Sequence, residues 1–525
     1  MPSVLIADEL SPRALEIFGE RGIATEVRVG LKPLELAAAL NGHAGLAVRS
    51  GAKVTRDVLA AAKDLKVVGR AGIGVDNIDV PAATQRGIVV MNTPHGNSIT
   101  TAEHAIALMM ALARQIPAAD KSTHAGKWEK SRFMGVELSG KTLGVVGCGN
   151  IGAIVADRAH GLKMRVLAFD PYLSEERACD LGVQKVELDD LLARADFITL
   201  HTPLTDSTRH IIDANALAKT RPGMRLINCA RGGLVDEAAL KAALDSGHVA
   251  GAALDVFAEE PAKANPLFGM DTVIATPHLG ASTSEAQEKV AIQVAEQMAD
   301  FLLTGAVSNA LNMPSVTAEE APRLRPYMAL AQLLGSFAGQ LTHSGLKGVT
   351  IEYEGHAAEL NTRPITAAAL AGLLTPLLDS VNMVNAPVLA RERNIEVTEI
   401  RHDRPGDYQT LMRLAVVTDR RSRDVAGTLF GGDKPRIVEI KGIRIEAELG
   451  RHMLYTTNED KPGFIGRLGT LLGQSGINIA TFHLGRSAPG GDAIALIEVD
   501  QAMGEDLLAR VRAIPGVVQA EALTF

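Results

Sequence analysis

Three side chains in the middle of the chain, Arg231, Glu260 and His278, are of the types that serve the oxidation of a 2-hydroxy acid. That reaction needs a base for the hydroxyl proton, and a cation that holds the carboxylate and polarises the nascent carbonyl. Histidine supplies a base near neutral pH, arginine is the best fork for a carboxylate, and a carboxylate bonded to an imidazole fixes its tautomer. Each residue taken singly is more often a surface or turn residue. Their shared place, at the ends of predicted strands that follow a nucleotide-binding turn, favours the catalytic interpretation.

The nucleotide-binding turn is the G-x-G-x-x-G triplet at 147–152, which is entered by the apolar run 142–146. Its first glycine would make the tight turn, the second would let the backbone approach a pyrophosphate, and the third would allow close helix–strand packing. The N-terminus of the following helix offers free N–H groups to the phosphates. A second apolar run ends in Asp170, where a carboxylate would meet the ribose hydroxyls, and no Arg adjoins it to bind a 2′-phosphate. The sequence therefore predicts dinucleotide binding and favours NAD over NADP. A ligand-free α/β turn is the alternative.

Composition describes an ordinary globular protein of several domains. The 525 residues are too many for one core and predict three or four domains. A net charge of −8 gives no general attraction to nucleic acid or to an anionic membrane. The three cysteines show no C-x-x-C spacing and no disulfide framework, which fits a reducing cytosol, and we predict no metal site. The N-terminus has no signal-peptide pattern, and the most apolar long stretch, 102–116, carries charged residues and does not resemble a membrane span. We therefore expect a cytoplasmic location.

Strand and helix patterns alternate in two series, 1–95 and 98–277, and the second series contains the nucleotide-binding turn. Such alternation predicts parallel, doubly wound α/β sheets. One long helical pattern, 282–304, would cross back to the first domain. The predicted strands are 4–7, 44–48, 65–69 and 87–91 in the first series, and 142–146, 164–169, 197–200, 225–228, 252–255 and 273–276 in the second.

Polar residues at the ends of these strands are candidates for ligand contact, because open α/β sheets bind ligands outside the carboxyl ends of their strands. Arg49 and Arg70 each follow a predicted strand of the first series, and we interpret both as anion contacts. The glycines beside them fit simple turns equally well.

Several segments carry a family resemblance. GCGNIG at 147–152, NCARGGLVDE at 228–237, LDVFAEEP at 254–261 and TPHLGAST at 276–283 resemble the D-isomer-specific 2-hydroxyacid dehydrogenases. VRSGAKVT at 48–55, VVGRAGIGVDNID at 67–79 and VMNTPHGNSITTAEHAIALMMALAR at 90–114 are similar to the phosphoglycerate dehydrogenase branch of that family. The resemblance implies NAD-dependent oxidation of D-3-phosphoglycerate to 3-phosphohydroxypyruvate, the entry to serine biosynthesis. A side reduction of 2-oxoglutarate to 2-hydroxyglutarate stays open, since that acid also offers two anionic ends.

The resemblance also implies residue roles. Arg231 would orient the substrate, Glu260 would assist, and His278 would be the acid/base. Glu260 is chosen over Glu259 because the residue before Pro261 matches the motif. The implied NAD site comprises Gly147, Gly149, Asn150, Ile151, Gly152, Asp170, Thr202, Cys229, Ala230, Arg231, Asp255, His278 and Gly280. The implied substrate site comprises Arg49, Ser50, Gly74 and Asn92, with Arg70 and Arg132 as further phosphate candidates.

The last stretch, 452–525, has a ferredoxin-like β-α-β-β-α-β pattern, and its D-x-P-G turn at 460–463 resembles that of ACT domains, which bind amino acids. Carried over, Asn458, Asp460 and Asn478 would bind L-serine as an effector. An ACT fold that pairs subunits without a ligand is the alternative. Residues 311–450 resemble the intervening domain of long phosphoglycerate dehydrogenases, a domain that can carry an anion site. The basic residues Arg436, Lys441 and Arg444 could form that site or a solvated strand face.

The domain prediction therefore has four parts. They are a substrate-binding domain (1–97 and 283–310), an NAD-binding Rossmann domain (98–282), an intervening α/β domain (311–450) and an ACT regulatory domain (451–525). The helix 100–114 is apolar on most sides and lies in a dimer interface in the relatives, so we expect a homodimer or homotetramer.

Two alternatives remain open at this point. A glyoxylate or hydroxypyruvate reductase of the same family is disfavoured by the long C-terminal extension. A non-catalytic amino-acid sensor would require a lost catalytic residue, whereas Arg231, Glu260 and His278 are all present.

Overall fold

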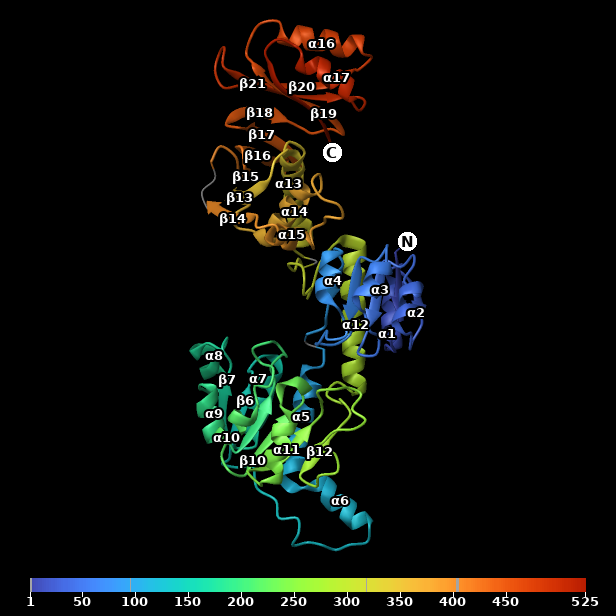
Figure 1. Ribbon diagram of the computed structural model, residues 1–525, viewed down its shortest axis with the longest axis vertical. Coiled ribbons are helices and arrows are strands. Elements are labelled where there is room, and N and C mark those ends of the chain that lie inside the picture. The colour runs from blue at the N-terminus through green and yellow to red at the C-terminus, as the bar shows by residue number, and fades with distance from the viewer. Residues whose placement is uncertain (1, 95, 318, 403–405) are drawn as a thin grey trace.

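The computed structural model describes residues 2–94, 96–317, 319–402 and 406–525. The molecule is elongated, and four sheets follow one another along its long axis (Figure 1). The N-terminal sheet lies in the middle, the second sheet of the sequence lies at one end, and the two C-terminal sheets lie towards the other end. No helix in the described ranges is long and apolar enough to cross a membrane.

The N-terminal sheet and its helices form what we call the first lobe. Its elements are β1 (Ser3–Ile6), α1 (Pro12–Glu20), β2 (Ala24–Val27), α2 (Pro33–Ala39), β3 (Gly45–Val48), α3 (Arg56–Ala61), β4 (Val67–Arg70), α4 (Val80–Gln85) and β5 (Val89–Met91). All five strands are parallel, in the order β2-β1-β3-β4-β5. The strands β1, β3, β4 and β5 are almost fully buried, which explains their continuous apolar sequences. The edge strand β2 was not predicted, because its half-exposed side chains give no strong apolar pattern.

The long helix α12 (Ser284–Thr304) completes the first lobe and confirms the predicted crossing. The Thr283 side chain caps its N-terminus by accepting from Ala286 N–H, and Gly305 ends it in a left-handed conformation. Met298 packs so closely on the sheet that a Cβ on Gly69 would lie 2.3 Å from its sulfur. The core of the first lobe therefore includes a helix that begins nearly two hundred residues after the last strand of the same sheet.

The second sheet and its helices form the second lobe. Its elements are α5 (Ser98–Arg114), α6 (Ile116–His124), β6 (Thr142–Val146), α7 (Asn150–Gly161), β7 (Arg165–Phe169), α8 (Glu175–Asp180), β8 (Gln184–Lys185), α9 (Leu188–Arg194), β9 (Phe197–Leu200), α10 (Ala214–Lys219), β10 (Met224–Asn228), the 3₁₀ turn Gly232–Leu234, α11 (Glu237–Asp245), β11 (Val249–Leu254) and β12 (Val273–Ala275). The seven strands are parallel, in the order β12-β11-β10-β9-β6-β7-β8. The strand order reverses beside β6, which is where doubly wound folds bind dinucleotides.

Two further sheets follow. The third part contains α13 (Ala321–Gln340), β13 (Leu346–Gly355), α14 (Thr362–Leu374), α15 (Ala386–Glu392), β14 (Glu396–His402), β15 (Thr410–Thr418), β16 (Ser422–Phe430), β17 (Lys434–Ile440) and β18 (Ile443–Ala447). The last part contains β19 (His452–Glu459), α16 (Phe464–Gln474), β20 (Ile479–Arg486), β21 (Asp492–Val499), α17 (Glu505–Arg512) and β22 (Val517–Thr524). The last sheet is antiparallel in the order β20-β21-β19-β22, which confirms the predicted ferredoxin-like pattern.

Candidate active site

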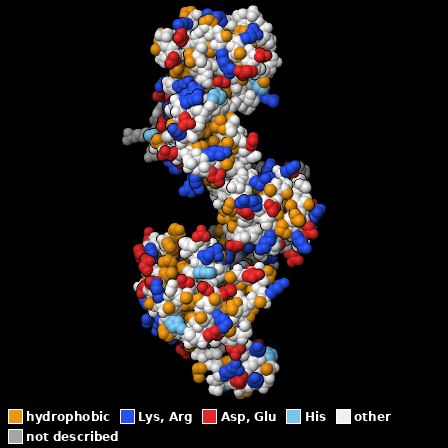
Figure 2. All heavy atoms as spheres, viewed as in Figure 1, with side chains coloured by type: hydrophobic (Ala, Val, Ile, Leu, Met, Phe, Trp, Pro, Cys, Tyr) orange, Lys and Arg blue, Asp and Glu red, His pale blue; other side chains and the backbone are white. Residues whose placement is uncertain are grey.

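A cleft of about 1120 Å³ runs between the first and second lobes. The space-filling view shows that the molecule is hollowed on one side, above the second lobe (Figure 2). Both lobes contribute loops that follow the carboxyl ends of their strands, as expected for open parallel sheets. The cleft brings together most of the predicted site residues: Arg49, Ser50, Arg70, Gly74, Asn150, Ile151, Thr202, Cys229, Ala230, Arg231, Glu260, His278 and Gly280.

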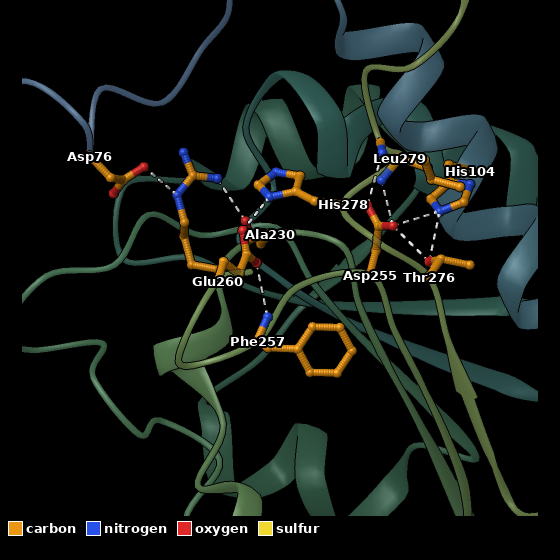
Figure 3. A network of polar contacts seen from close by, with 11 residues as sticks. Asp76, His104, Ala230, Asp255, Phe257, Glu260, Thr276, His278 and Leu279 are labelled. Carbon is orange, nitrogen blue, oxygen red and sulfur yellow. Dashed lines mark hydrogen bonds and ion pairs between the residues drawn. The ribbon is translucent and has the colours of Figure 1, made fainter. Parts of the chain in front are cut away.

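His278 and Glu260 form a hydrogen-bonded pair at the cleft. The distance from His278 Nδ1 to Glu260 Oε2 is 2.7 Å, and Glu260 Oε1 accepts from Phe257 N–H at 3.0 Å (Figure 3). Burial by itself raises the pKa of Glu260, but the hydrogen bonds from His278 and the Phe257 N–H outweigh it and hold the pKa below its usual value. An ionised carboxylate only accepts, so the proton of the neutral imidazole lies on Nδ1 and Nε2 is left as an acceptor.

Arg231 follows β10 and spans the cleft. Its Nε donates to Asp76 Oδ2 of the first lobe at 2.8 Å, and its Nη1 donates to Ala230 O at 2.7 Å. A Cβ on Gly74 would lie 1.5 Å from Arg231 Nη2, so the glycine lets the guanidinium lie directly on the first lobe's loop. Asp76 was not singled out in the sequence, although it lies within the VVGRAGIGVDNID motif.

Positive charge is concentrated on the first-lobe side of the cleft. Burial, together with the nearby charges of Arg231 and Arg49, lowers the pKa of Arg70 to about 10, while the charges of Asp76 and Asp8 oppose this shift. Arg70 Nε is buried with no hydrogen-bond partner among the described residues. A group of guanidinium ions that repel one another suits a ligand that carries more than one anionic group.

The glycine turn has the geometry that dinucleotide binding requires. Gly147 has φ +89°, and a Cβ on Gly152 would lie 2.1 Å from Gly147 O. Gly149 precedes α7, and a Cβ there would meet nothing within 4 Å, which leaves room for a pyrophosphate to approach the helix N-terminus. Asp170 accepts the N–H groups of Cys148 and Tyr172 at 2.9 and 2.8 Å and keeps one lone pair on each oxygen for ribose hydroxyls. These features fit NAD.

Asp255 lies behind the His278 loop and is fully buried. Burial raises its pKa, but hydrogen bonds from His104, Thr276 and the Leu279 N–H outweigh it, so the pKa is lowered overall. Burial and the charge of Asp255 raise the pKa of Cys229, whereas burial raises that of Cys148 to about 11. Both buried cysteines are therefore thiols at neutral pH and do not act as nucleophiles.

Two predicted substrate residues do not line the cleft. Asn92 is buried and donates from Nδ2 to Ile73 O at 2.6 Å, so it supports the loop that carries Gly74. Arg132 lies beyond α6, where it pairs with Glu129 at 3.1 Å and with Asp271 at 2.8 Å.

The predicted effector residues each have a partner of their own. Asp460 accepts from Gly490 N–H at 3.0 Å and from Arg486 at 2.9 Å, and these two bonds lower its pKa. Asn478 donates to Asp500 at 2.9 Å. Asn458 is buried. Its Nδ2 donates to Glu459 O at 2.9 Å, whereas its Oδ1 has no hydrogen-bond partner in the described part of the chain.

The three basic residues of the third part do not gather at one point. Arg436 pairs with Glu448 at 3.0 Å, and Arg444 pairs with Asp407 at 2.6 Å. Lys441 is partly buried, which lowers its pKa, and the charges of Arg423 and Arg421 lower it further. The structure therefore gives no support to one anion site built from the three predicted residues.

Known protein families match most of the chain. Residues 106–280 match the family described as D-isomer specific 2-hydroxyacid dehydrogenase, NAD binding domain. Residues 323–441 match the D-3-phosphoglycerate dehydrogenase intervening domain, and residues 452–516 match the ACT domain.

Individual relatives extend the similarity to nearly every residue. The D-3-phosphoglycerate dehydrogenase of Synechocystis sp. is 43% identical over 522 residues, which cover 99% of this chain and 94% of the relative. The enzyme of that name from Bacillus subtilis is 43% identical over 519 residues, which cover 99% of this chain and 98% of the relative. The crystal structure of a glyoxylate reductase from Paecilomyes thermophila is 30% identical with a TM-score of 0.55, but it covers 59% of this chain and 98% of its own. The chain thus belongs to the D-3-phosphoglycerate dehydrogenase family of D-isomer specific 2-hydroxyacid dehydrogenases.

Proposed function

We propose that this chain oxidises D-3-phosphoglycerate to 3-phosphohydroxypyruvate with NAD, the first step of serine biosynthesis. The observation that carries the proposal is the His278–Glu260 pair in a cleft that also holds Arg49, Arg70 and Arg231. The similarity to enzymes of this name over nearly the whole chain supports the same conclusion.

His278 is the base in this proposal. The reaction removes a proton from the substrate hydroxyl and a hydride from the carbon that bears it. Because Nδ1 donates to Glu260, Nε2 is available to take the hydroxyl proton. The negative charge of Glu260 stabilises the imidazolium that forms. NAD, when bound, accepts the hydride.

The arginines bind the two anionic ends of the substrate. Arg231 lies close to the His278–Glu260 pair, where its charge helps to lower the Glu260 pKa, so it is placed for the carboxylate and the nascent carbonyl oxygen. Arg49 and Arg70 lie on the first lobe and are assigned to the phosphate, together with Ser50 and Gly74. Asn92, which was predicted alongside Arg49, and Arg132 do not line the cleft, so both become weaker candidates than the residues that do.

NAD would lie along the second lobe. The glycine turn would seat the pyrophosphate and Asp170 the ribose. The remaining proposed contacts are Asn150, Ile151, Thr202, Cys229, Ala230 and Gly280. Asp255, which is fully buried, would act on the NAD site through the loop that it holds.

A reductase for glyoxylate or hydroxypyruvate is the competing assignment within the family. A substrate without a phosphate would leave the buried Arg70 Nε, which has no hydrogen-bond partner among the described residues, unpaired, which is unfavourable. The cationic first lobe therefore favours the phosphorylated acid. Reduction of 2-oxoglutarate stays a prediction.

The C-terminal ACT domain suggests an amino-acid effector, and we assign L-serine to Asp460, Asn478 and Asn458.

We also propose a cytoplasmic homodimer or homotetramer that associates through α5. Exposed Trp128 and Met134, in the segment after α6 of the same lobe, support an interface there, and a monomeric mass at micromolar concentration would contradict it.

The test compares substrates and variants by nicotinamide absorbance. The wild type should turn over 3-phosphoglycerate in preference to glycerate and lactate.

Arg49→Gln should raise KM for 3-phosphoglycerate at least about tenfold, as expected for a lost charged hydrogen bond, with glycerate turnover nearly unchanged. His278→Asn should lower kcat by about 10² or more while NAD still binds. A wild type that prefers glycerate or lactate would refute the substrate, and an active His278→Asn variant would refute the base.

A further inference from the structure

The carboxylate of Asp255 holds the segment that carries His278. Oδ1 accepts from Thr276 Oγ1 at 2.6 Å and from Leu279 N–H at 2.7 Å, and Oδ2 accepts from Gly280 N–H at 2.8 Å. The main-chain oxygen of Asp255 accepts from His278 N–H at 2.9 Å. Asp255 itself is not among the side chains that line the cleft. Its contacts therefore act on the loop from behind.

His104 contacts the Asp255 carboxylate from helix α5. It projects from α5, and its Nε2 lies 3.2 Å from Asp255 Oδ1 and 3.4 Å from Thr276 Oγ1 (Figure 3). One helical turn earlier, the Thr101 hydroxyl donates to Gly280 O at 2.9 Å. Two side chains on one face of α5 thus brace the loop, one directly and one through the buried carboxylate.

The loop needs such bracing because of the backbone at His278. Its φ is +57°, in the left-handed region that a side chain other than glycine rarely adopts. Such conformations persist where the surroundings fix them from several sides. Among the described residues the ring bonds to Glu260 alone, so the position of the base depends on how firmly its backbone is held.

We propose that His104 is a positioning residue for the His278 base: its hydrogen bond to Asp255 fixes the 276–280 segment in the geometry that catalysis requires. The inference rests on the proposed role of His278. In the described part of the chain, His104 is the only titratable side chain within hydrogen-bond distance of the Asp255 carboxylate. Without it, that carboxylate loses a partner inside the protein and can turn away from the backbone groups that it holds.

The experiment uses the full-length enzyme and three variants. His104→Leu removes the hydrogen bond, His104→Gln keeps an amide donor at similar reach, and Glu103→Gln is the matched control, an exposed neighbour on the same helix. Two quantities are measured: the steady-state constants with NAD and 3-phosphoglycerate, and amide hydrogen exchange in the peptide that spans 276–282.

His104→Leu should lower kcat about tenfold, since small misplacements of a catalytic group have effects of this order or larger, with both KM values within about twofold. Exchange at Leu279 and Gly280 should quicken in the same variant. His104→Gln should restore both quantities, and Glu103→Gln should change neither. Should His104→Leu fail to fold by circular dichroism, His104→Asn replaces it, because its side chain is too short to reach Asp255.

Three outcomes overturn the inference: unchanged kcat in His104→Leu, lowered kcat with unchanged exchange, or a Gln variant as impaired as the Leu variant. The His278→Asn variant separates this failure from that of the proposed function. If it stays active, His278 is not the base, whereas the exchange measurement still reports whether His104 holds the segment.

Discussion

At the scale of the residue, the two carboxylate oxygens of Glu260 accept from different partners. One faces the imidazole of His278 and the other accepts the Phe257 N–H, so the carboxylate is fixed in orientation by its own main chain. Glu259, its neighbour in the sequence, is exposed and makes no comparable bond among the described residues. The pair therefore offers a matched comparison between a carboxylate held against the base and one in solvent.

We expect Glu260→Gln to lower kcat about tenfold or more and to move the acid limb of the pH–rate profile to lower pH, because an uncharged partner stabilises the imidazolium less. Glu259→Gln should keep the profile and kcat of the wild type. The measurement is kcat from pH 5 to 9 for all three proteins. Equal effects of the two substitutions would sink the assignment.

His201 couples the stability of the second lobe to pH. It is one of the residues that line the cleft, it bonds to the Thr199 hydroxyl at 2.9 Å, and burial lowers its pKa from 6.5 to about 4. Between these two values the unfolded chain binds a proton that the folded chain does not, so stability is lost as the pH falls through this window. The loss amounts to about 1 kcal/mol per pH unit.

A His201→Gln variant should therefore show a weaker dependence of thermal stability on pH between 7 and 5 than the wild type does. The comparison is between slopes, so a general destabilisation by the substitution does not matter. Parallel slopes for the two proteins would contradict the assignment.

At the scale of the element, the glycines in and just before helix α7 differ in what surrounds them. Gly149 faces open space with φ −74°, so its small size matters only to a ligand, whereas Gly152 is pressed against Gly147 O. Gly161, at the other end of the helix, also meets nothing within 4 Å.

We expect Gly149→Ala to leave the melting temperature without ligand nearly unchanged and to raise the Kd for NAD at least about tenfold, since a methyl group would occupy the pyrophosphate approach. Gly161→Ala is the control and should alter neither. Calorimetric titration with NAD measures the Kd of both variants, and thermal unfolding without ligand measures their melting temperatures. Unchanged affinity in Gly149→Ala would place the pyrophosphate elsewhere.

Local signals made the glycine turn, the long α12 and the catalytic motifs predictable, because each depends on a backbone conformation or a periodicity within one short segment. Partners from distant segments were not predictable. Asp76 meets Arg231 across 155 positions, and His104 meets Asp255 from another helix. The edge strand β2 and the two-residue β8 were missed because neither has an apolar pattern long enough to read.

At the scale of the whole molecule, the proposed serine site lies at the opposite end from the second lobe (Figure 1). Asp460→Ala removes an acceptor for the Gly490 N–H and a partner of Arg486, and should raise the serine concentration for half-inhibition at least about tenfold with unchanged activity in its absence. Asp506→Ala, on the exposed first turn of α17, is the control. Activity of the wild type that serine leaves unaffected would make the ACT domain an assembly element.

Helix α12 has a consequence for synthesis on the ribosome. The first lobe's sheet is complete once β5 has emerged, but its covering helix begins only at Ser284. At the usual rates of translation, the intervening stretch takes about 10 to 40 s to make. During that delay α12 does not yet cover the apolar face of the sheet that includes Val4, Ala47 and Val67. The second lobe is encoded without interruption and can fold first, so the N-terminal part of this enzyme is finished after the part that follows it.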